Sequence, residues 1–161
     1  PILLTSLCFL EGEGELPLPH RVKKAADPNQ GKWIGVGGKF EEGESPEECA
    51  VREVREETGL TMLEPELRGI VTFVNDRYPT EYMFLFTCSR FSGELAADCP
   101  EGVLRWVKKE EALSLPMWEG DRVFFRLLRE GRPFFSLKLV YSGDRLDRAV
   151  VDGKEIPAVF R

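Results

Sequence analysis

The sequence of 161 residues is poor in residues that several common enzyme classes require. Its single histidine, His20, argues against a histidine-rich zinc site and against a Ser-His-Asp triad. The cysteines are few and widely spaced, and none of them forms a CxxC pair. This pattern is typical of reduced, buried thiols and predicts a cytoplasmic protein. The cysteines are Cys8, Cys49, Cys88 and Cys99.

Long hydrophobic runs are also absent. The apolar stretch 2–10 is too short to cross a bilayer, and it contains Thr5 and Ser6. It has neither the basic flank nor the A-x-A-like cleavage site of a secretory signal. We therefore expect this stretch to form a buried strand, and we expect no membrane partner.

An excess of basic residues is missing as well. The formal net charge is −6 at pH 7, which argues against a broad basic surface for duplex nucleic acid. An acidic enzyme still binds a nucleotide when metal ions mediate the contact, so the charge does not exclude nucleotide chemistry.

The residues that are present predict one folded domain over residues 1–161. Hydrophobic residues make up 42% and charged residues 31%, as in ordinary globular domains, and no repeat or linker interrupts the chain. Strand patterns alternate with helical patterns, which indicates a mixed α/β or α+β fold. We expect strands at 2–10, 15–21, 66–74, 81–91, 103–107, 133–141 and 146–151, a helical turn at 109–113, and helices at 46–58 and 120–130.

The helix at 46–58 has clear signals at both ends. Ser45 can cap its first turn, Pro46 suits the first helical position, and Glu48 completes an S-x-x-E capping box. Gly59 suits the left-handed conformation that often follows a helix. These residues fix the register of the helix, and with it the face on which its acidic residues lie.

Three acidic residues of this helix, Glu53, Glu56 and Glu57, stand at positions i, i+3 and i+4. Helical geometry places them within one arc of roughly 100°, where they repel one another unless a cation lies between them. Oxygen ligands suit a hard ion such as Mg²⁺ or Mn²⁺. Arg52 lies beside Glu56 at i+4 and can hold or screen the cluster. The pattern predicts a metal-dependent enzyme that acts on phosphates.

The same stretch resembles a known family motif over residues 38–60. It resembles the Nudix box, GX5EX7REUXEEXGU with U aliphatic, at Gly38, Glu44, Arg52-Glu53-Val54, Glu56-Glu57 and Gly59-Leu60. The resemblance implies an α/β/α sandwich with a mixed β-sheet. It also implies a hydrolase that uses Mg²⁺, or Mn²⁺ in its place, to cleave nucleoside diphosphates linked to another group.

The resemblance further assigns roles to individual residues of this chain. Glu53, Glu56, Glu57 and the Gly37 carbonyl are the implied metal ligands, with Glu101 as an additional ligand from a loop. Glu44 and Arg52 are implied to orient the cluster, and either Glu53 or Glu56 is the implied base for water.

Segments outside the box narrow the resemblance. Residues 31–39 and 116–121 are similar to the MutT-type branch, and within it to enzymes that sanitise oxidised purine triphosphates such as 8-oxo-dGTP. The products in that branch are a nucleoside monophosphate and pyrophosphate. The implied substrate contacts are Trp118 stacking on the purine, Asp121 on its edge, Lys23 at a phosphate and Thr5 in the base pocket.

Two positions depart from that branch, and several alternatives stay open. Ile34 stands where the related animal enzyme has a base-reading Asn, and Gly120 stands where it has the first of two Asp residues. Tyr78 and Pro79 leave room for a dinucleoside polyphosphate or ADP-ribose as the substrate. A non-catalytic nucleotide sensor and an acidic structural domain are the remaining alternatives, and the protein is either a monomer or a homodimer.

Overall fold

The computed structural model describes residues 1–11, 15–20, 35–94, 98–99, 102–108 and 117–157. Several expectations from the sequence lie outside these residues: those for Lys23, Ile34 and Glu101, and the helical turn at 109–113. The described part contains both predicted helices and the whole stretch 38–60.

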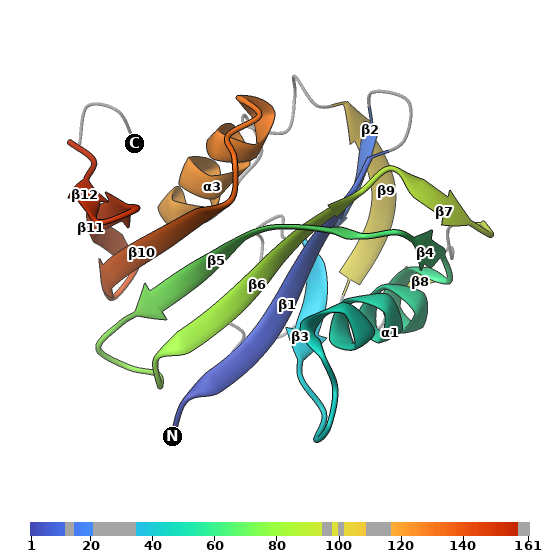
Figure 1. Cartoon of the computed structure of the whole chain (residues 1–161), viewed down its shortest axis with the longest axis horizontal. Coiled ribbons are helices and arrows are strands. Elements are labelled where there is room, and N and C mark those ends of the chain that lie inside the picture. Colours follow the sequence, from blue (N-terminus) through green and yellow to red (C-terminus); the bar gives the residue numbers. More distant parts are fainter. Residues whose placement is uncertain (12–14, 21–34, 95–97, 100–101, 109–116, 158–161) are drawn as a thin grey trace.

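A seven-stranded mixed sheet forms the centre of the protein (Figure 1). Its strands, in spatial order, are β12 (Lys154–Glu155), β11 (Arg145–Val151), β10 (Phe135–Ser142), β5 (Glu66–Val74), β6 (Glu81–Cys88), β1 (Leu3–Leu10) and β3 (Val36–Lys39). Strand β1 runs parallel to β6 and β10 runs parallel to β5, whereas the other neighbours are antiparallel. Strand β3 is therefore an edge strand of this sheet.

Two smaller sheets complete the strands of the described residues. One contains β2 (Glu15–His20), β9 (Gly102–Lys108) and β8 (Asp98–Cys99), and the other pairs β4 (Thr61–Leu63) with β7 (Arg90–Ser92). The predicted strand at 81–91 is divided, because β6 ends at Cys88 and β7 begins at Arg90. The strands β3, β4, β8 and β12 were not predicted. Strands β4, β8 and β12 have only two or three residues, and β3 contains two glycines, so none of them shows an alternating pattern.

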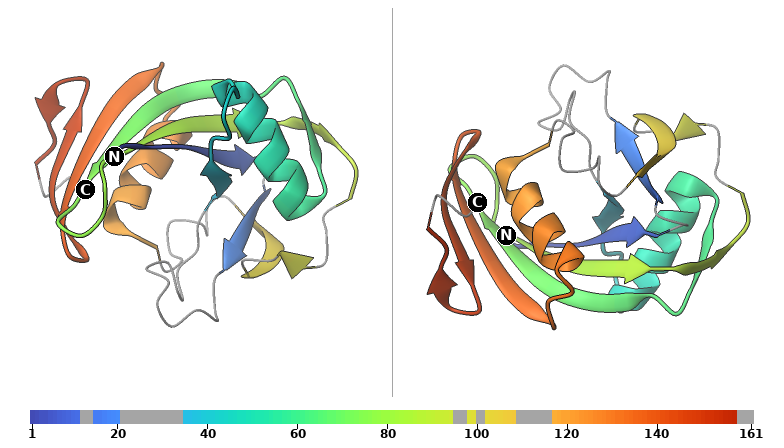
Figure 2. Two further views of the ribbon diagram at one scale, coloured as in Figure 1. Left: turned by 90° about the horizontal axis from the view of Figure 1, so that it is seen from below. Right: turned by 90° about the horizontal axis from the view of Figure 1, so that it is seen from above.

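Helices α1 (Pro46–Thr58) and α3 (Glu119–Arg129) lie on opposite faces of the large sheet (Figure 2). Side chains alternate between the faces of a strand, and β1 shows the consequence. Its Cys8 and Leu10 pack in one core cluster with Ala50 and Val54 of α1, whereas Phe9 belongs to the cluster of α3. The sandwich expected from the sequence is confirmed.

The predicted caps of α1 are present. The Ser45 hydroxyl accepts a hydrogen bond from the Glu48 amide at 3.1 Å, and the Glu48 carboxylate accepts one from the Ser45 amide at 2.9 Å. Gly59 follows the helix with φ of 79°, in the left-handed region. Both ends of α1 are therefore fixed by local interactions that the sequence specifies.

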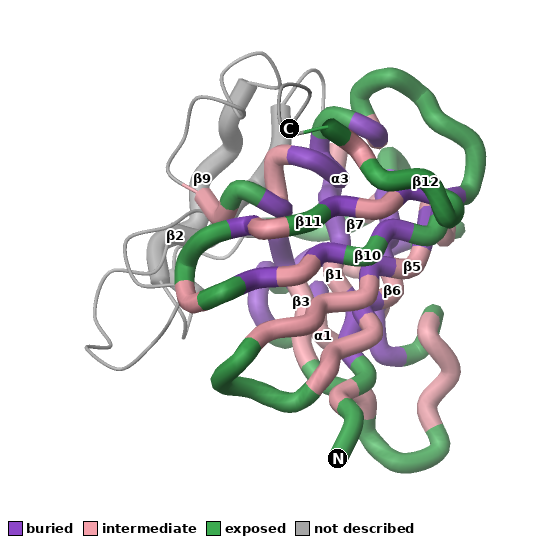
Figure 3. Tube along the Cα trace, turned by 90° about the vertical axis from the view of Figure 1, so that its left-hand side faces the viewer, coloured by how far each residue is buried: buried purple, intermediate pink, exposed green. Residues whose placement is uncertain are grey.

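Strands β10 and β11 form the predicted terminal hairpin and extend the large sheet. Burial alternates residue by residue along β10, which places Leu137, Leu139 and Tyr141 against α3 (Figure 3). Phe134, expected inside this strand, precedes it and is exposed. Neither of the two helices in the described part of the chain is long and apolar enough to cross a membrane.

Candidate active site

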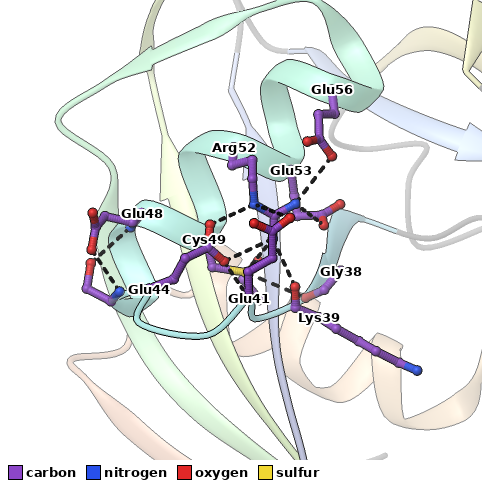
Figure 4. Close-up of polar contacts among 11 residues, drawn as sticks. Gly38, Lys39, Glu41, Glu44, Glu48, Cys49, Arg52, Glu53 and Glu56 are labelled. Atoms are coloured by element: carbon purple, nitrogen blue, oxygen red, sulfur yellow. Dashed lines mark hydrogen bonds and ion pairs between the residues drawn. The ribbon is translucent and has the colours of Figure 1, made fainter.

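Arg52 of α1 connects the acidic residues of the helix to the loop that precedes it (Figure 4). Its Nε lies 2.6 Å and its Nη2 lies 3.0 Å from the two carboxylate oxygens of Glu44, which makes a bidentate pair. Its Nη1 lies 2.7 Å from Glu53 and 3.3 Å from Glu56. Nη2 also donates to the Lys39 carbonyl at 3.0 Å, so one guanidinium fixes the loop, the edge strand and the helix together.

The ionisation of Glu44 reflects this arrangement. The hydrogen bond from Arg52, followed by one from the Glu41 backbone amide, lowers the pKa of Glu44 to about 2. The hydrogen bond to Glu44, followed by the one to Glu53, raises the pKa of Arg52. Both partners are charged at neutral pH, and Arg52 can orient Glu53 as the resemblance implied.

The glycines Gly37 and Gly38 of β3 let the carboxylates approach the edge of the sheet. The Gly37 amide donates to the carboxylate of Glu57 at 3.2 Å, and Glu57 is only 8% exposed. A Cβ on Gly38 would lie 2.5 Å from Cδ of Glu53, well inside van der Waals contact. The carboxylate of Glu53 thus occupies the space that a side chain at residue 38 would fill.

The donor atoms near this edge fit a hard divalent cation, because carboxylate and carbonyl oxygens are the ligands that Mg²⁺ prefers. As they stand, no three His, Cys, Asp or Glu side chains of the described residues are arranged to hold a metal ion. Arg52 accounts for this arrangement, because its guanidinium forms ion pairs with Glu53 and Glu56. The Glu56 side chain is 59% exposed, so it can turn toward Glu53 and Glu57 with little loss of packing.

A cavity of about 800 Å³ lies on the α3 side of the sheet and reaches β3. Four of the residues to which the resemblance gives a role in the site line this cavity. They are the implied metal ligand Gly37 and the implied substrate contacts Thr5, Trp118 and Asp121. The residues Glu53, Glu56 and Glu57 are not part of its lining. Glu53 lies against Gly38, and Glu57 lies against Gly37. Both of these glycines line the cavity.

Tyr141 of β10 organises the end of the cavity at α3. Its ring meets the Trp118 indole edge to face, with centroids 5.6 Å apart, and its hydroxyl accepts a hydrogen bond from the Gly120 amide at 2.7 Å. Burial, and then the negative charge of Asp121, raise the pKa of Tyr141, which therefore stays neutral. A side chain at Gly120 would collide with this hydroxyl, which explains the glycine at that position.

Sequence reasoning missed Tyr141, and it also missed Glu81 at the start of β6. The Thr5 hydroxyl donates to the Glu81 carboxylate at 2.6 Å, and both residues line the cavity. These contacts join residues 21 and 76 positions apart, so no local motif marks them. The available signal was alternation, which places Tyr141 on the inward face of its strand.

Comparisons with known proteins agree with this geometry. The NUDIX domain family model matches residues 4–128. The MutT protein of Bacillus halodurans has a solved structure that superposes with a TM-score of 0.85 and 30% identity, covering 93% of this chain and 97% of that one. The uncharacterised Nudix hydrolase YvcI of Bacillus subtilis is 35% identical over 119 residues, which is 71% of this chain and 75% of YvcI.

Two further relatives differ from each other in the substrates that their names give. The oxidised purine nucleoside triphosphate hydrolase of Danio rerio is 32% identical, over 65% of this chain and 67% of its own. Diphosphoinositol polyphosphate phosphohydrolase 3-alpha of mouse is 34% identical, over 68% of this chain and 65% of its own. With a family model that spans most of the sequence, the chain belongs to the Nudix family, among the MutT-type hydrolases that act on phosphorus anhydrides.

Proposed function

We propose that this protein hydrolyses purine nucleoside triphosphates, including oxidised ones such as 8-oxo-dGTP, to a monophosphate and pyrophosphate with Mg²⁺. One observation carries the proposal. A single cavity has Trp118 and Asp121 at one end and Gly37 and Gly38 at the other, with the carboxylates of α1 behind the glycines. Removal of damaged nucleotides from the precursor pool is the corresponding cellular role.

The α3 end of the cavity suits a purine. The half-buried Trp118 offers an aromatic face held in place by Tyr141, and stacking on such a face stabilises any purine. Asp121 adds a carboxylate, which accepts hydrogen bonds from ring N–H and amino groups. Asp121 thereby takes over part of the base reading that Ile34 cannot perform, because an aliphatic side chain forms no hydrogen bonds.

The β3 end suits the phosphates and the reaction. When bound, Mg²⁺ supplies charge neutralisation at phosphate oxygens and a lower pKa for water. Glu53, Glu56 and Glu57 would hold it with the Gly37 carbonyl, and Glu53 or Glu56 would take the proton from water. Arg52 keeps Glu53 oriented through its contact of 2.7 Å. Glu101 and Lys23 complete the proposal as a further ligand and a phosphate contact.

The charged side chains in the cavity help to choose among the alternative substrates. Its described lining contains two cationic side chains, Lys39 and Arg77, and three anionic ones, Glu81, Asp121 and Asp144. An inositol ring that carries many phosphates needs a strongly basic site. The mixed charges of this described lining therefore favour a nucleotide, whose base and sugar are uncharged, over such a ring. Tyr78 and Pro79 also line the cavity, which keeps ADP-ribose and dinucleoside polyphosphates as the second candidates.

A substrate panel with Mg²⁺ tests the proposal: 8-oxo-dGTP, dGTP, ADP-ribose and diadenosine tetraphosphate. We expect the highest kcat/KM for 8-oxo-dGTP, and release of pyrophosphate rather than phosphate. Trp118→Ala should raise KM for both purine triphosphates, whereas Phe134→Ala, an exposed aromatic outside the cavity, should not. If 8-oxo-dGTP ranks no higher than dGTP, the assignment to oxidised purines fails.

A further inference from the structure

Glu81 is an acidic residue on an otherwise apolar part of the sheet. In the strand register it pairs with Phe73 on β5 and with Leu3 on β1, and all three residues line the cavity. Met83, two positions along the same strand, lines it as well. A carboxylate among apolar neighbours costs free energy unless hydrogen-bond donors reach it. We therefore expect hydrogen-bond donors near the Glu81 carboxylate.

Thr5 supplies one of these donors. Its hydroxyl lies 2.6 Å from Oε2 of Glu81, and Thr5 itself is only 7% exposed. Within the described part of the chain, this is the only hydrogen bond or ion pair of the Glu81 side chain. Thr5 thus holds one carboxylate oxygen in place and leaves the other, Oε1, to accept hydrogen bonds from a molecule in the cavity.

The order of strands shows which part of a nucleotide would lie there. From one end of the cavity to the other, the strands are β10, β5, β6, β1 and β3. Tyr141, beside the proposed base site, is on β10, and Gly37, beside the proposed phosphate site, is on β3. Glu81 and Thr5 lie between them, on β6 and β1. Four steps of about 4.8 Å separate the outer strands, a span suited to an extended nucleoside triphosphate.

We propose that Glu81 reads the sugar of the substrate and that Thr5, which the resemblance placed in the base pocket, is instead its positioning residue. The free carboxylate oxygen accepts hydrogen bonds from the vicinal 2′- and 3′-hydroxyls of ribose, as acidic residues do in dinucleotide sites. A deoxyribose lacks the 2′-hydroxyl and loses one such bond to a charged group. The protein should therefore prefer ribonucleotides to deoxyribonucleotides of the same base by roughly tenfold. This inference rests on the proposed function.

The test measures kcat/KM for GTP, dGTP, 8-oxo-GTP and 8-oxo-dGTP. For each base, the value for the ribonucleotide is divided by the value for the deoxyribonucleotide. We expect Glu81→Gln and Glu81→Leu to bring both ratios close to one, mainly through a higher KM for the ribonucleotides. Thr5→Val should lower the ratios in the same way, and Thr5→Ser, which keeps the hydroxyl, should restore them. Glu66→Gln, an exposed acid at the far end of β5, is the matched control and should leave the ratios unchanged.

Two results would overturn the inference. One is a wild-type ratio near one, or a ratio that Glu81→Leu leaves intact in a variant that still unfolds at the wild-type temperature. The other is an equal loss of kcat for both sugars in Glu81→Gln, which would place Glu81 in the chemical step. The proposed function is tested separately, because it depends on ratios between bases at a fixed sugar.

Discussion

Replacement of Gly38 by alanine should lower the activity of this protein and leave its stability nearly unchanged. Gly38 does not have a positive φ, so its backbone accepts alanine without strain. The added Cβ would lie 2.5 Å from Cδ of Glu53 and 2.6 and 2.7 Å from its two oxygens. These atoms end a flexible side chain, so the carboxylate moves and the strand does not.

The size of that movement sets the expected effect. Ordinary van der Waals contact begins at 3.4 Å, so the Glu53 carboxylate must retreat by roughly 1 Å. A displacement of that size at a reacting group lowers rates by about 100-fold. We expect Gly38→Ala to lower kcat for 8-oxo-dGTP with Mg²⁺ by about that factor, with a free energy of unfolding within about 1 kcal/mol of wild type.

Two other glycines serve as matched controls. Gly43 has φ of 83° and no atoms within 4 Å of the place that an added Cβ would take, so Gly43→Ala should lose about 1 kcal/mol of stability and keep full activity. At Gly37, a Cβ would collide with the Ser6 backbone carbonyl of β1, so Gly37→Ala should lose more than about 2 kcal/mol. Full activity in a well-folded Gly38→Ala protein would refute the assigned position of Glu53 in the reaction.

Three further predictions concern other parts of the structure. Glu53→Gln should lower kcat by about 100-fold or more while thermal unfolding stays unchanged, and a normal rate would remove Glu53 from the reaction. Gly120→Ala should displace the Tyr141 hydroxyl and raise KM for purine triphosphates, with a smaller change in kcat, as steady-state kinetics will show. The Ser136 amide lowers the pKa of Asp152, so this carboxylate stabilises the fold above its ordinary pKa of 3.8. Asp152→Asn should therefore lower the urea midpoint near pH 7, and the difference from wild type should vanish as the pH falls below that value.

The sequence predicted those parts of the site that are local in the chain. The caps at Ser45 and Gly59 fixed α1, and the helix in turn fixed the arc of Glu53, Glu56 and Glu57. For Arg52, helical spacing alone predicted Glu56, whose contact is 3.3 Å, whereas the shorter bidentate contact is with Glu44 in the preceding loop. The resemblance to the Nudix box implied that Glu44 and Arg52 act together, and no helical rule does so.

The parts that could not be predicted depend on the order of strands. Thr5 meets Glu81 because β1 pairs in parallel with β6, and Tyr141 reaches Gly120 because β10 lies under α3. Parallel pairing needs long connections, and no residue within either strand identifies its partner. Alternation identified which side chains face inward, but it did not identify which strands would bring them together.

The two glycines of β3 explain how one cavity can serve recognition and chemistry. The carboxylates belong to α1, which packs on one face of the sheet, whereas the proposed base and sugar contacts lie on the other face, under α3. A strand with side chains would separate them. At the edge, Gly37 and Gly38 leave only the backbone between the two sides, so carboxylates behind the sheet can act on a substrate bound in front of it. The chemistry can then stay constant while residues on the α3 face change the substrate, which is why Tyr141 and Glu81 should alter KM far more than kcat.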